Sequence, residues 1–472
     1  MDLDIQCEEL SASRWTELVL SMNTCKTVRY RLDDCSLSAN NCKDIGSVLS
    51  SNKSLTELTL NNNELGDSGV ELLCKGLMAP SCNLQKLWYR LQNCNLTDAC
   101  CKHLRSVLST KPSLIELHLG DNKLKTSGVK VLCEGLLDPN CQLQKLQYRL
   151  EYCELKPDIC ELLCTALRTK SSLKMLNLSN NRLGDPAIKL LCQGLMDPNC
   201  KLQSLQCSVE NCHITTASCG DLSTVLASKP CLTDLSVGEN KIGDAGLALL
   251  CQGLLNPTCQ IEKLWYRLWE CGLTPASCKD LAQVLRTKES LTEVSLIGND
   301  LGDAGMEQLC QGLKDPKAKL QALWYRIREC GFTTACCKSL SSALGTNQTL
   351  RELHMGGNKV GDAGVEIIHE GLMSPNCNLR SLWYRLGNCD LSAACCGHLA
   401  TIISSKQCLT ELDLSNNALE DEGVKKLCEA LRQPGCKLQQ LVYSLYDIYW
   451  SSETDDELKV LEESIPGLKI VS

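Results

Sequence analysis

The sequence predicts an α/β solenoid of right-handed β-α units, with a curved parallel sheet on the concave face of a horseshoe and helices outside. Three observations predict this class. The segment LTELTLNNNEL at residues 55–65 recurs along the chain, a second segment that ends in cysteine alternates with it, and apolar residues at helical spacing separate the two. A chain that repeats in this way extends one quasi-one-dimensional core, so its 472 residues need not form several domains.

The repeats have a period of 59 residues, and each period contains two subtypes. Both fit the pattern L-x-x-L-x-L-x-x-N/C-x-L, which is the signature of a leucine-rich repeat. The first subtype carries an asparagine at the N/C position and the second a cysteine. The asparagines are Asn63, Asn122, Asn181, Asn240, Asn299, Asn358 and Asn417, and the cysteines are Cys35, Cys94, Cys153, Cys212, Cys271, Cys330 and Cys389.

The signature explains the local structure. Leucines in L-x-L alternate inward on a short strand, because strand side chains have a period of two. The Asn or Cys that follows lies where the chain turns away, and its side chain can bond turn backbone that would otherwise be buried without a partner.

A helix then returns the chain in each unit, and a polar residue is expected to cap it. The expected caps of the Asn subtype are Asp67, Asp185, Asp244, Asp303, Asp362 and Asp421, with Thr126 as the equivalent acceptor. Those of the Cys subtype are Ser38, Thr97, Thr215, Thr274, Thr333 and Ser392, and Lys156 departs from the rule. Helical spacing places six cysteines on the buried side, namely Cys74, Cys133, Cys192, Cys251, Cys310 and Cys428.

Composition narrows the function. The net charge of -8 disfavours nucleic acid and anionic membranes as partners and favours basic ones. No segment has the features of a secretory leader or a membrane span, so we expect a soluble, cytoplasmic protein. An odd count of 35 cysteines in a long chain then indicates reduced thiols rather than a disulfide scaffold.

No catalytic or cofactor site is expected. The six histidines are scattered without a paired nucleophile, and there is no phosphate-binding loop. The adjacent pairs Cys100-Cys101, Cys336-Cys337 and Cys395-Cys396 lack the spacing of metal ligands. The sequence therefore favours a binding protein over an enzyme.

Two sets of residues are predicted to point into the hollow. In the Asn subtype, the residue before the second leucine is outward, and it is acidic in six of seven copies: Glu57, Glu116, Met175, Asp234, Glu293, Glu352 and Glu411. This column should attract a basic ligand, although a solvated edge also carries carboxylates commonly. In the Cys subtype, the equivalent position is predicted to carry Trp88, Trp265, Trp324 and Trp383, with Trp269 nearby. Exposed tryptophans are typical of interface hot spots.

The alternating subtypes, the cysteine content, the opening LDIQCEELS, the recurrent LCQGL and the ending YDIYW…LKIVS resemble the cytosolic ribonuclease inhibitors over essentially the whole chain. The resemblance implies a monomer that binds a pancreatic-type ribonuclease one to one, blocks its active site and loses activity on thiol oxidation. It implies an N-terminal cap (1–25), repeats (26–445) and a C-terminal cap (446–472). The implied contacts are Glu293, Arg328, Glu352, Glu411, Tyr446, Asp447, Tyr449, Lys469 and Ser472. The alternative is the ligand-sensing repeat domain of an NLR-type innate immune receptor.

One feature departs from that family, whose double unit has 57 residues. A dipeptide is added at the same place in every copy: Tyr30-Arg31, Tyr89-Arg90, Tyr148-Arg149, Cys207-Ser208, Tyr266-Arg267, Tyr325-Arg326, Tyr384-Arg385 and Tyr443-Ser444. An insertion of two residues preserves the alternation of inward and outward side chains along the strand. The strand must nevertheless bulge or shift its pairing register relative to its neighbours, and the added tyrosine would point inward. Either eight copies gained a dipeptide together, or a shifted exon boundary inserts it each time. We favour the second explanation as a hypothesis.

Overall fold

The computed structural model describes most of the chain. The described residues are 2–4, 11–24, 29–88, 96–119, 122, 124–147, 157–178, 183–206, 213–237, 240–261, 263–264, 271–296, 298–324, 331–355, 358–383, 389, 391–415, 417–442 and 451–471. They form two compact units, Met1–Val237 (unit 1) and Gly238–Ser472 (unit 2). Among these residues, no helix is both long and apolar enough to cross a lipid bilayer.

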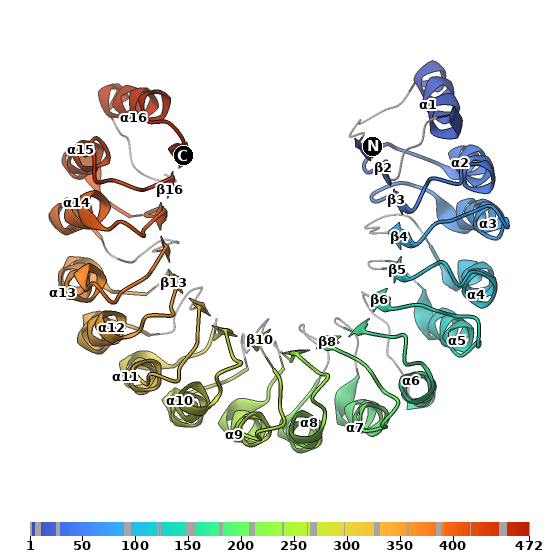
Figure 1. The fold of residues 1–472 in the computed structure, drawn as a ribbon, viewed down its shortest axis with the longest axis horizontal. Coiled ribbons are helices and arrows are strands. Elements are labelled where there is room, and N and C mark those ends of the chain that lie inside the picture. The colour runs from blue at the N-terminus through green and yellow to red at the C-terminus, as the bar shows by residue number, and fades with distance from the viewer. Residues whose placement is uncertain are drawn as a thin grey trace. The chain divides into compact units, whose positions relative to one another are not determined.

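Unit 1 is a parallel sheet with helices on one side of it. Its strands pair in chain order, and within the unit they lie on the inner side of an arc while the helices lie outside (Figure 1). The strands are β1 Asp2–Asp4, β2 Arg29–Arg31, β3 Glu57–Thr59, β4 Lys86–Trp88, β5 Glu116–His118, β6 Lys145–Gln147, β7 Met175–Asn177, β8 Ser204–Gln206 and β9 Asp234–Ser236. The helices are α1 Ala12–Thr24, α2 Ala39–Ser51, α3 Gly66–Leu77, α4 Cys101–Thr110 (after the 3-10 turn η1 Asp98–Cys100), α5 Lys125–Leu136, α6 Pro157–Thr169, α7 Gly184–Leu195 and α8 Thr216–Ser228.

Unit 2 repeats the same arrangement. Its strands are β10 Lys263–Leu264, β11 Glu293–Ser295, β12 Ala322–Trp324, β13 Glu352–His354, β14 Ser381–Trp383, β15 Glu411–Asp413, β16 Gln440–Val442 and β17 Lys469–Val471. Its helices are α9 Gly243–Leu254, α10 Cys278–Thr287 (after η2 Pro275–Ser277), α11 Gly302–Leu313, α12 Thr334–Thr346, α13 Gly361–Met373, α14 Cys396–Ser405 (after η3 Ala393–Cys395), α15 Glu420–Leu431 and α16 Ser452–Ser464. The predicted fold class, an α/β leucine-rich-repeat solenoid, is confirmed.

The core lies between the sheet and the helices and is aliphatic. Leu58 and Leu60 of the first Asn-subtype repeat are both buried, as the period of two requires. The six helix cysteines predicted on the buried side are all buried. Because strands pack about 4.8 Å apart and helices about 8–10 Å apart, each unit curves with its sheet inside.

The asparagine at the strand end bonds turn backbone, as predicted. Asn63 Oδ1 accepts from the backbone N–H groups of Cys35 (3.2 Å) and Leu37 (2.9 Å) in the preceding repeat. Its Nδ2 donates to the carbonyl of Leu32 at 2.8 Å. Asn299 accepts in the same way from Cys271 and Leu273. These buried amides join consecutive turns, so each repeat depends on its neighbour.

The prediction for the helix caps is half right. In the Cys subtype, Thr97, Thr215, Thr274, Thr333 and Ser392 are N-caps whose hydroxyls accept a backbone N–H. At Ser38, the Asn41 side chain accepts the backbone N–H of Ser38.

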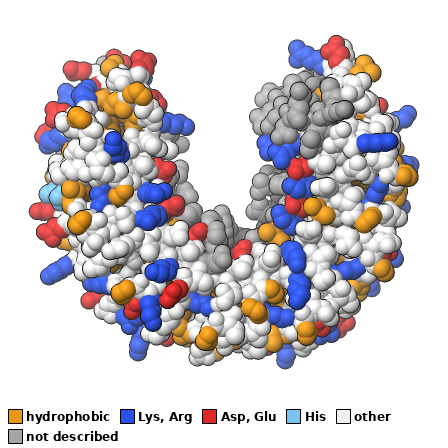
Figure 2. Space-filling view, in the orientation of Figure 1, with side chains coloured by type: hydrophobic (Ala, Val, Ile, Leu, Met, Phe, Trp, Pro, Cys, Tyr) orange, Lys and Arg blue, Asp and Glu red, His pale blue; other side chains and the backbone are white. Residues whose placement is uncertain are grey.

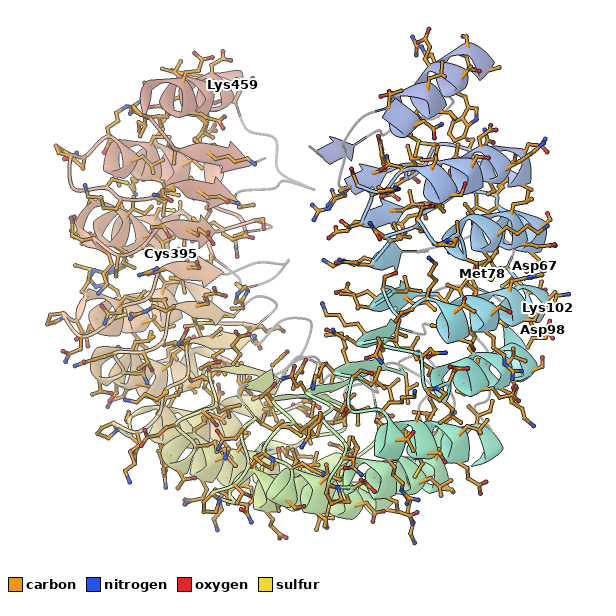
Figure 3. All side chains as sticks on the ribbon, turned by 45° about the vertical axis from the view of Figure 1, so that its right-hand side comes forward. Asp67, Met78, Asp98, Lys102, Cys395 and Lys459 are labelled. Carbon is orange, nitrogen blue, oxygen red and sulfur yellow. The ribbon has the colours of Figure 1, made fainter. Side chains whose placement is uncertain are left out.

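In the Asn subtype, the assignment of Asp67 and its equivalents as N-caps is wrong. Gly66, in the left-handed region with φ 61°, turns the chain into α3, and Asp67 follows inside the first turn. Its carboxylate instead accepts from the backbone N–H (2.8 Å) and the hydroxyl (2.6 Å) of Thr97 in the next repeat. Asp67 lies close to Asp98, which begins the next helical segment (Figure 3).

The added dipeptide can be followed in its first copy. Tyr30 lies in the middle of β2, is fully buried, and pairs with Leu58. In the next copy the strand residue that pairs with Leu58 is Leu87, which precedes the dipeptide. In the first copy the register of strand pairing is therefore shifted by two residues, the length of the dipeptide. Its tyrosine points inward as predicted. The other copies lie outside the described residues.

Candidate partner-binding face

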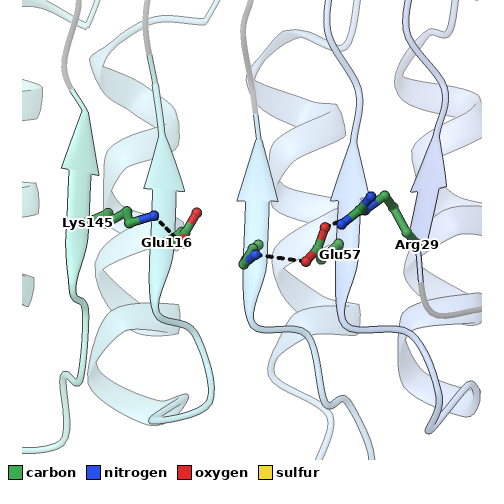
Figure 4. A network of polar contacts seen from close by, with 5 residues as sticks. Arg29, Glu57, Glu116 and Lys145 are labelled. Carbon is green, nitrogen blue, oxygen red and sulfur yellow. Dashed lines mark hydrogen bonds and ion pairs between the residues drawn. The ribbon is translucent and has the colours of Figure 1, made fainter. Parts of the chain in front are cut away.

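Within each unit, the residues at the first position of successive strands lie side by side in a row, which we call the first-position row. Those whose side chains are described point to the face of the sheet opposite the helices (Figure 4). In unit 1 its members, in order of pairing, are Asp2, Arg29, Glu57, Lys86, Glu116, Lys145, Met175, Ser204 and Asp234. In unit 2 they are Lys263, Glu293, Ala322, Glu352, Ser381, Glu411, Gln440 and Lys469.

In unit 1 the row alternates in charge and its members pair across strands. Glu57 is held from both sides, by Arg29 Nε at 2.5 Å and Lys86 Nζ at 2.8 Å. Lys145 Nζ lies 2.9 Å from Glu116 Oε1 (Figure 4). These five residues are called the ion-pair ladder below. Figure 2 shows acidic and basic side chains interleaved on the strand side of this unit.

The ladder stabilises the charged forms of Glu57 and Lys86. The hydrogen bond from Arg29 lowers the pKa of Glu57, and Lys86 lowers it further, although burial opposes both. In return, the hydrogen bond with Glu57 raises the pKa of Lys86. The carboxylate of Glu57 is only 18% exposed. Its charge is thus compensated within the sheet.

Between Glu293 and Gln440, the same row in unit 2 is acidic with neutral spacers. Glu293, Glu352 and Glu411 lie on alternate strands, with Ala322 and Ser381 between them. We call the three glutamates the acidic comb. Alternate strands put its members roughly 10 Å apart.

The comb is electrostatically unlike the ladder. Burial raises the pKa of Glu352, and repulsion from Glu293 and Glu411 raises it further. The side chain of Glu352 is 44% exposed, and His354 Nε2 lies 3.9 Å from its carboxylate. Ser381 Oγ donates to Glu411 at 2.9 Å. The carboxylates of the comb therefore repel one another, and a bound cationic ligand would reduce this repulsion.

The structure changes the predicted acidic column in two ways. The column is not uniform, because Glu57 and Glu116 are compensated by lysine and arginine of adjacent strands. Its equivalence with the tryptophans is also wrong, since Trp88 pairs with Thr59, whereas Lys86 pairs with Glu57. The signal was present in the sequence, where the residue two before each predicted tryptophan position is Lys86, Lys145, Ser204, Lys263, Ala322, Ser381 or Gln440.

Several predicted contacts lie outside the described residues. Glu293, Glu352, Glu411 and Lys469 are described, and Lys469 is exposed on β17 beside Gln440. The residues whose side chains are not described are Trp88, Trp265, Trp269, Trp324, Arg328, Trp383, Tyr446, Asp447, Tyr449 and Ser472.

The cysteines that the structure describes are reduced thiols. Burial raises the pKa of Cys74 and of Cys310 to about 12, which keeps these sulfurs protonated and unreactive at neutral pH. Cys395, on η3 of unit 2, adjoins Cys396 at the start of α14 (Figure 3). Among the described residues, no group of three or more His, Cys, Asp or Glu could hold a metal ion.

Known proteins share this organisation along the whole chain. The family described as "Capping Ribonuclease inhibitor Leucine Rich Repeat" matches residues 1–30, and "Leucine Rich repeat" matches seven segments between residues 51 and 428. The "Ribonuclease inhibitor" of Mus musculus is 49% identical over 472 residues, covering 100% of both chains. That of Sus scrofa is 48% identical with the same coverage. The chain belongs to the ribonuclease inhibitor family.

Immune-receptor relatives match only in part. The "NACHT, LRR and PYD domains-containing protein 12" of Homo sapiens is 42% identical over 79% of this chain, but the match covers 34% of that protein. The two ribonuclease inhibitors match over the whole length of both chains, whereas the receptors match over part of theirs, so the alternative of a sensing domain is not favoured. The resemblance inferred from the repeats is confirmed.

Proposed function

We propose that this chain is a protein inhibitor of ribonucleases of the pancreatic type, including angiogenin-like ones, and not an enzyme. The observation that carries the proposal is the identity of 49% and 48% to two ribonuclease inhibitors over the complete length of both chains in each comparison. The inhibitor would cover the active site of the ribonuclease with the face of the sheet that carries the first-position row, and it would exclude RNA sterically.

The acidic comb supports the choice of partner. An enzyme that cleaves RNA must hold a polyanion, so the surface around its active site is cationic. Carboxylates of Glu293, Glu352 and Glu411 can meet such groups in place of phosphates. Further proposed contacts are Trp265, Trp269, Trp324, Arg328, Trp383, Tyr446, Asp447, Tyr449, Lys469 and Ser472.

The proposal extends to the state of the protein. We expect a cytoplasmic monomer that forms one-to-one complexes without a cofactor and does not bind nucleic acid or membranes. Residues 1–25 and 446–472 would cap the repeats of 26–445. Because the described thiols are reduced and mostly buried, oxidation that forces disulfides between them should disrupt the array and abolish inhibition.

The test is inhibition of RNA cleavage by a pancreatic-type ribonuclease, titrated with the full-length, reduced protein. We expect cleavage to stop near equimolar protein, and the ribonuclease to retain the protein when immobilised. The variant Glu352→Gln/Glu411→Gln should bind at least about tenfold more weakly, because two charge contacts are lost. Glu366→Gln, an exposed position on α13, is the matched control and should behave as the parent. Undiminished cleavage with excess parent protein would contradict the proposed function.

A further inference from the structure

The ion-pair ladder of unit 1 has a bearing on specificity that the acidic comb alone does not explain. We propose that Arg29, Lys86 and Lys145 are specificity-determining residues, which neutralise Glu57 and Glu116 so that cationic proteins are attracted to unit 2 and not to the equivalent face of unit 1. The inference rests on the proposed function for the identity of the partner, but not for the behaviour of unit 1 itself.

Two glutamates at the same position of the repeat have different neighbours. Glu57 and Glu352 each occupy the first position of an Asn-subtype strand. The neighbours of Glu57 in the row are Arg29 and Lys86, and those of Glu352 are Ala322 and Ser381. The two carboxylates differ accordingly, since the pKa of Glu57 is lowered and that of Glu352 is raised. The position itself therefore does not decide the local charge, but the adjacent Cys-subtype strand does.

The difference persists at a distance. Paired charges 2.8–2.9 Å apart, as in Lys86–Glu57 and Lys145–Glu116, act as small dipoles whose fields cancel beyond the Debye length of about 8 Å at physiological salt. The carboxylates of the comb have the same sign, so their fields add. The three cations and two carboxylates of the ladder leave one net positive charge, whereas the comb carries three negative charges. An approaching basic protein is consequently attracted at the comb and not at the ladder.

At contact the ladder also repels. The side chains of Lys86 and Lys145 are 30% and 45% exposed, so their ammonium groups would meet the cations of a partner docked on unit 1. A charge opposed by a like charge is a means of rejecting the wrong complex. The ion-pair ladder thus prevents the repeats of unit 1 from forming a second binding site for cationic proteins.

The experiment removes the lysines and leaves the carboxylates. Lys86→Ser/Lys145→Ser gives unit 1 the spacer that unit 2 has at Ser381, and Lys86→Gln/Lys145→Gln keeps more of the side-chain length should the first variant fold poorly. The matched control is Lys102→Ser/Lys130→Ser, which changes net charge equally at exposed helix positions of unit 1. Lys86→Arg/Lys145→Arg keeps both positive charges and should therefore behave as the parent.

Two readouts are used for each folded variant. The first is retention of hen lysozyme, a basic protein that is not a ribonuclease, by the immobilised chain at low salt. The second is the salt dependence of the association rate with a pancreatic-type ribonuclease. We expect the ladder variants to retain lysozyme at least about tenfold more than the parent and to show a steeper salt dependence, while the helix control stays near the parent.

Equal lysozyme retention and equal salt dependence in the ladder variants and the helix control would overturn the inference. A parent chain that does not inhibit ribonuclease would instead contradict the proposed function, and the lysozyme measurement would still decide the role of the ladder.

A third variant separates local from overall charge. Lys86→Ser/Ser381→Lys moves one positive charge from unit 1 to the gap between Glu352 and Glu411 and leaves the net charge unchanged. We expect ribonuclease association at low salt to slow by about tenfold. We also expect lysozyme to bind at unit 1 instead of unit 2, so that the further substitution Glu352→Gln does not lower the amount of lysozyme retained. Association at the parent's rate would overturn the inference, because only net charge would then matter.

Discussion

At the scale of single residues, a glutamate has opposite electrostatic properties in different copies of one repeat. Sequence periodicity correctly predicted that Glu57 and Glu352 occupy the same outward position. It did not predict their different charge environments, because these depend on which residue of the neighbouring strand comes into register. That register aligns Glu57 with Lys86 rather than with Trp88.

The raised pKa of Glu352 predicts a pH-dependent contribution to binding. Burial, Glu293 and Glu411 favour the protonated form in the free protein, while a cationic partner favours the ionised form. The contribution of Glu352 to affinity is therefore present at neutral pH and is lost as the pH falls through its pKa, above the ordinary value of 4.5.

The measurement compares ribonuclease affinity of the parent and Glu352→Gln between pH 7.5 and 5. The parent should bind about tenfold more tightly at neutral pH, and this advantage should shrink as the pH falls. A constant ratio across the range would show that Glu352 does not titrate in the complex as argued.

At the scale of elements, adjacent repeats are joined by an aspartate of one helix and the N-cap of the next. The contact seen for Asp67 and Thr97 recurs as Asp185–Thr215, Asp244–Thr274, Asp303–Thr333, Asp362–Ser392 and Asp421–Ser451. The sequence pattern predicted both residues as caps, each of its own helix, since a capping pattern shows residue type and not the partner. The two departures from the capping pattern, Thr126 and Lys156, occupy the two equivalent sequence positions of a single junction.

The aspartate contact predicts a loss of stability in Asp303→Ala. Burial would raise the pKa of Asp303, but the hydrogen bonds from Thr333 outweigh it, and the net effect lowers this pKa below 3.8. Removing the carboxylate should lower the free energy of unfolding by about 1–3 kcal/mol at pH 7, measured by urea denaturation. Since a lowered acid pKa stabilises the fold above the unfolded value, the loss should vanish as the pH falls through the lowered pKa.

The control for this prediction is the junction whose sequence has Thr126 and Lys156 in place of the aspartate and the hydroxyl residue. Thr126→Asp/Lys156→Thr installs the pair there and should stabilise the protein by about 1 kcal/mol. If Asp303→Ala unfolds at the same urea concentration as the parent, the contact does not couple the repeats.

A second inter-repeat contact uses a lysine that the repeat signature does not include. Lys288 is 8% exposed, and its ammonium donates to the carbonyls of Asn256 and Cys259, just beyond α9. Lys111, Lys170, Lys229 and Lys406 do the same in their repeats, while Asn52 and Asn347 substitute an amide. A lysine in a polar turn gives no sequence signal that its ammonium reaches back to another repeat.

This contact predicts that Lys288→Met destabilises the protein more than Lys288→Asn. Methionine fills the space but leaves the two carbonyls without their donor, at a cost of about 1–3 kcal/mol. Asparagine reproduces the natural solution of Asn347, whose amide donates to the Leu313 carbonyl at 2.8 Å. Urea denaturation of both variants would refute the role of the ammonium if methionine were tolerated as well as asparagine.

At the scale of the whole molecule, the 59-residue period predicted the fold correctly but did not show how the two added residues of each period are accommodated. The repeats gave the fold class, the buried leucines and the asparagine turns, because these follow from spacing. Spacing could not tell where an added dipeptide is accommodated. In β2 it lies within the strand and buries Tyr30, whereas β4 pairs through Leu87, ahead of the dipeptide.

The exon-boundary hypothesis makes a prediction about the natural protein that proteolysis can check. With the dipeptide, trypsin cuts after both Lys86 and Arg90 and releases the short peptide LWYR. Without it, Lys86 is followed by one continuous peptide that begins LWLQNC. In β2 the strand would then pair through Val28, the residue that aligns with Leu87, and the ladder would not need to slide. We therefore expect mass spectra of the protein from its natural source to contain LWLQNC peptides, and abundant LWYR with peptides beginning LQNC would instead establish that the 59-residue period is real.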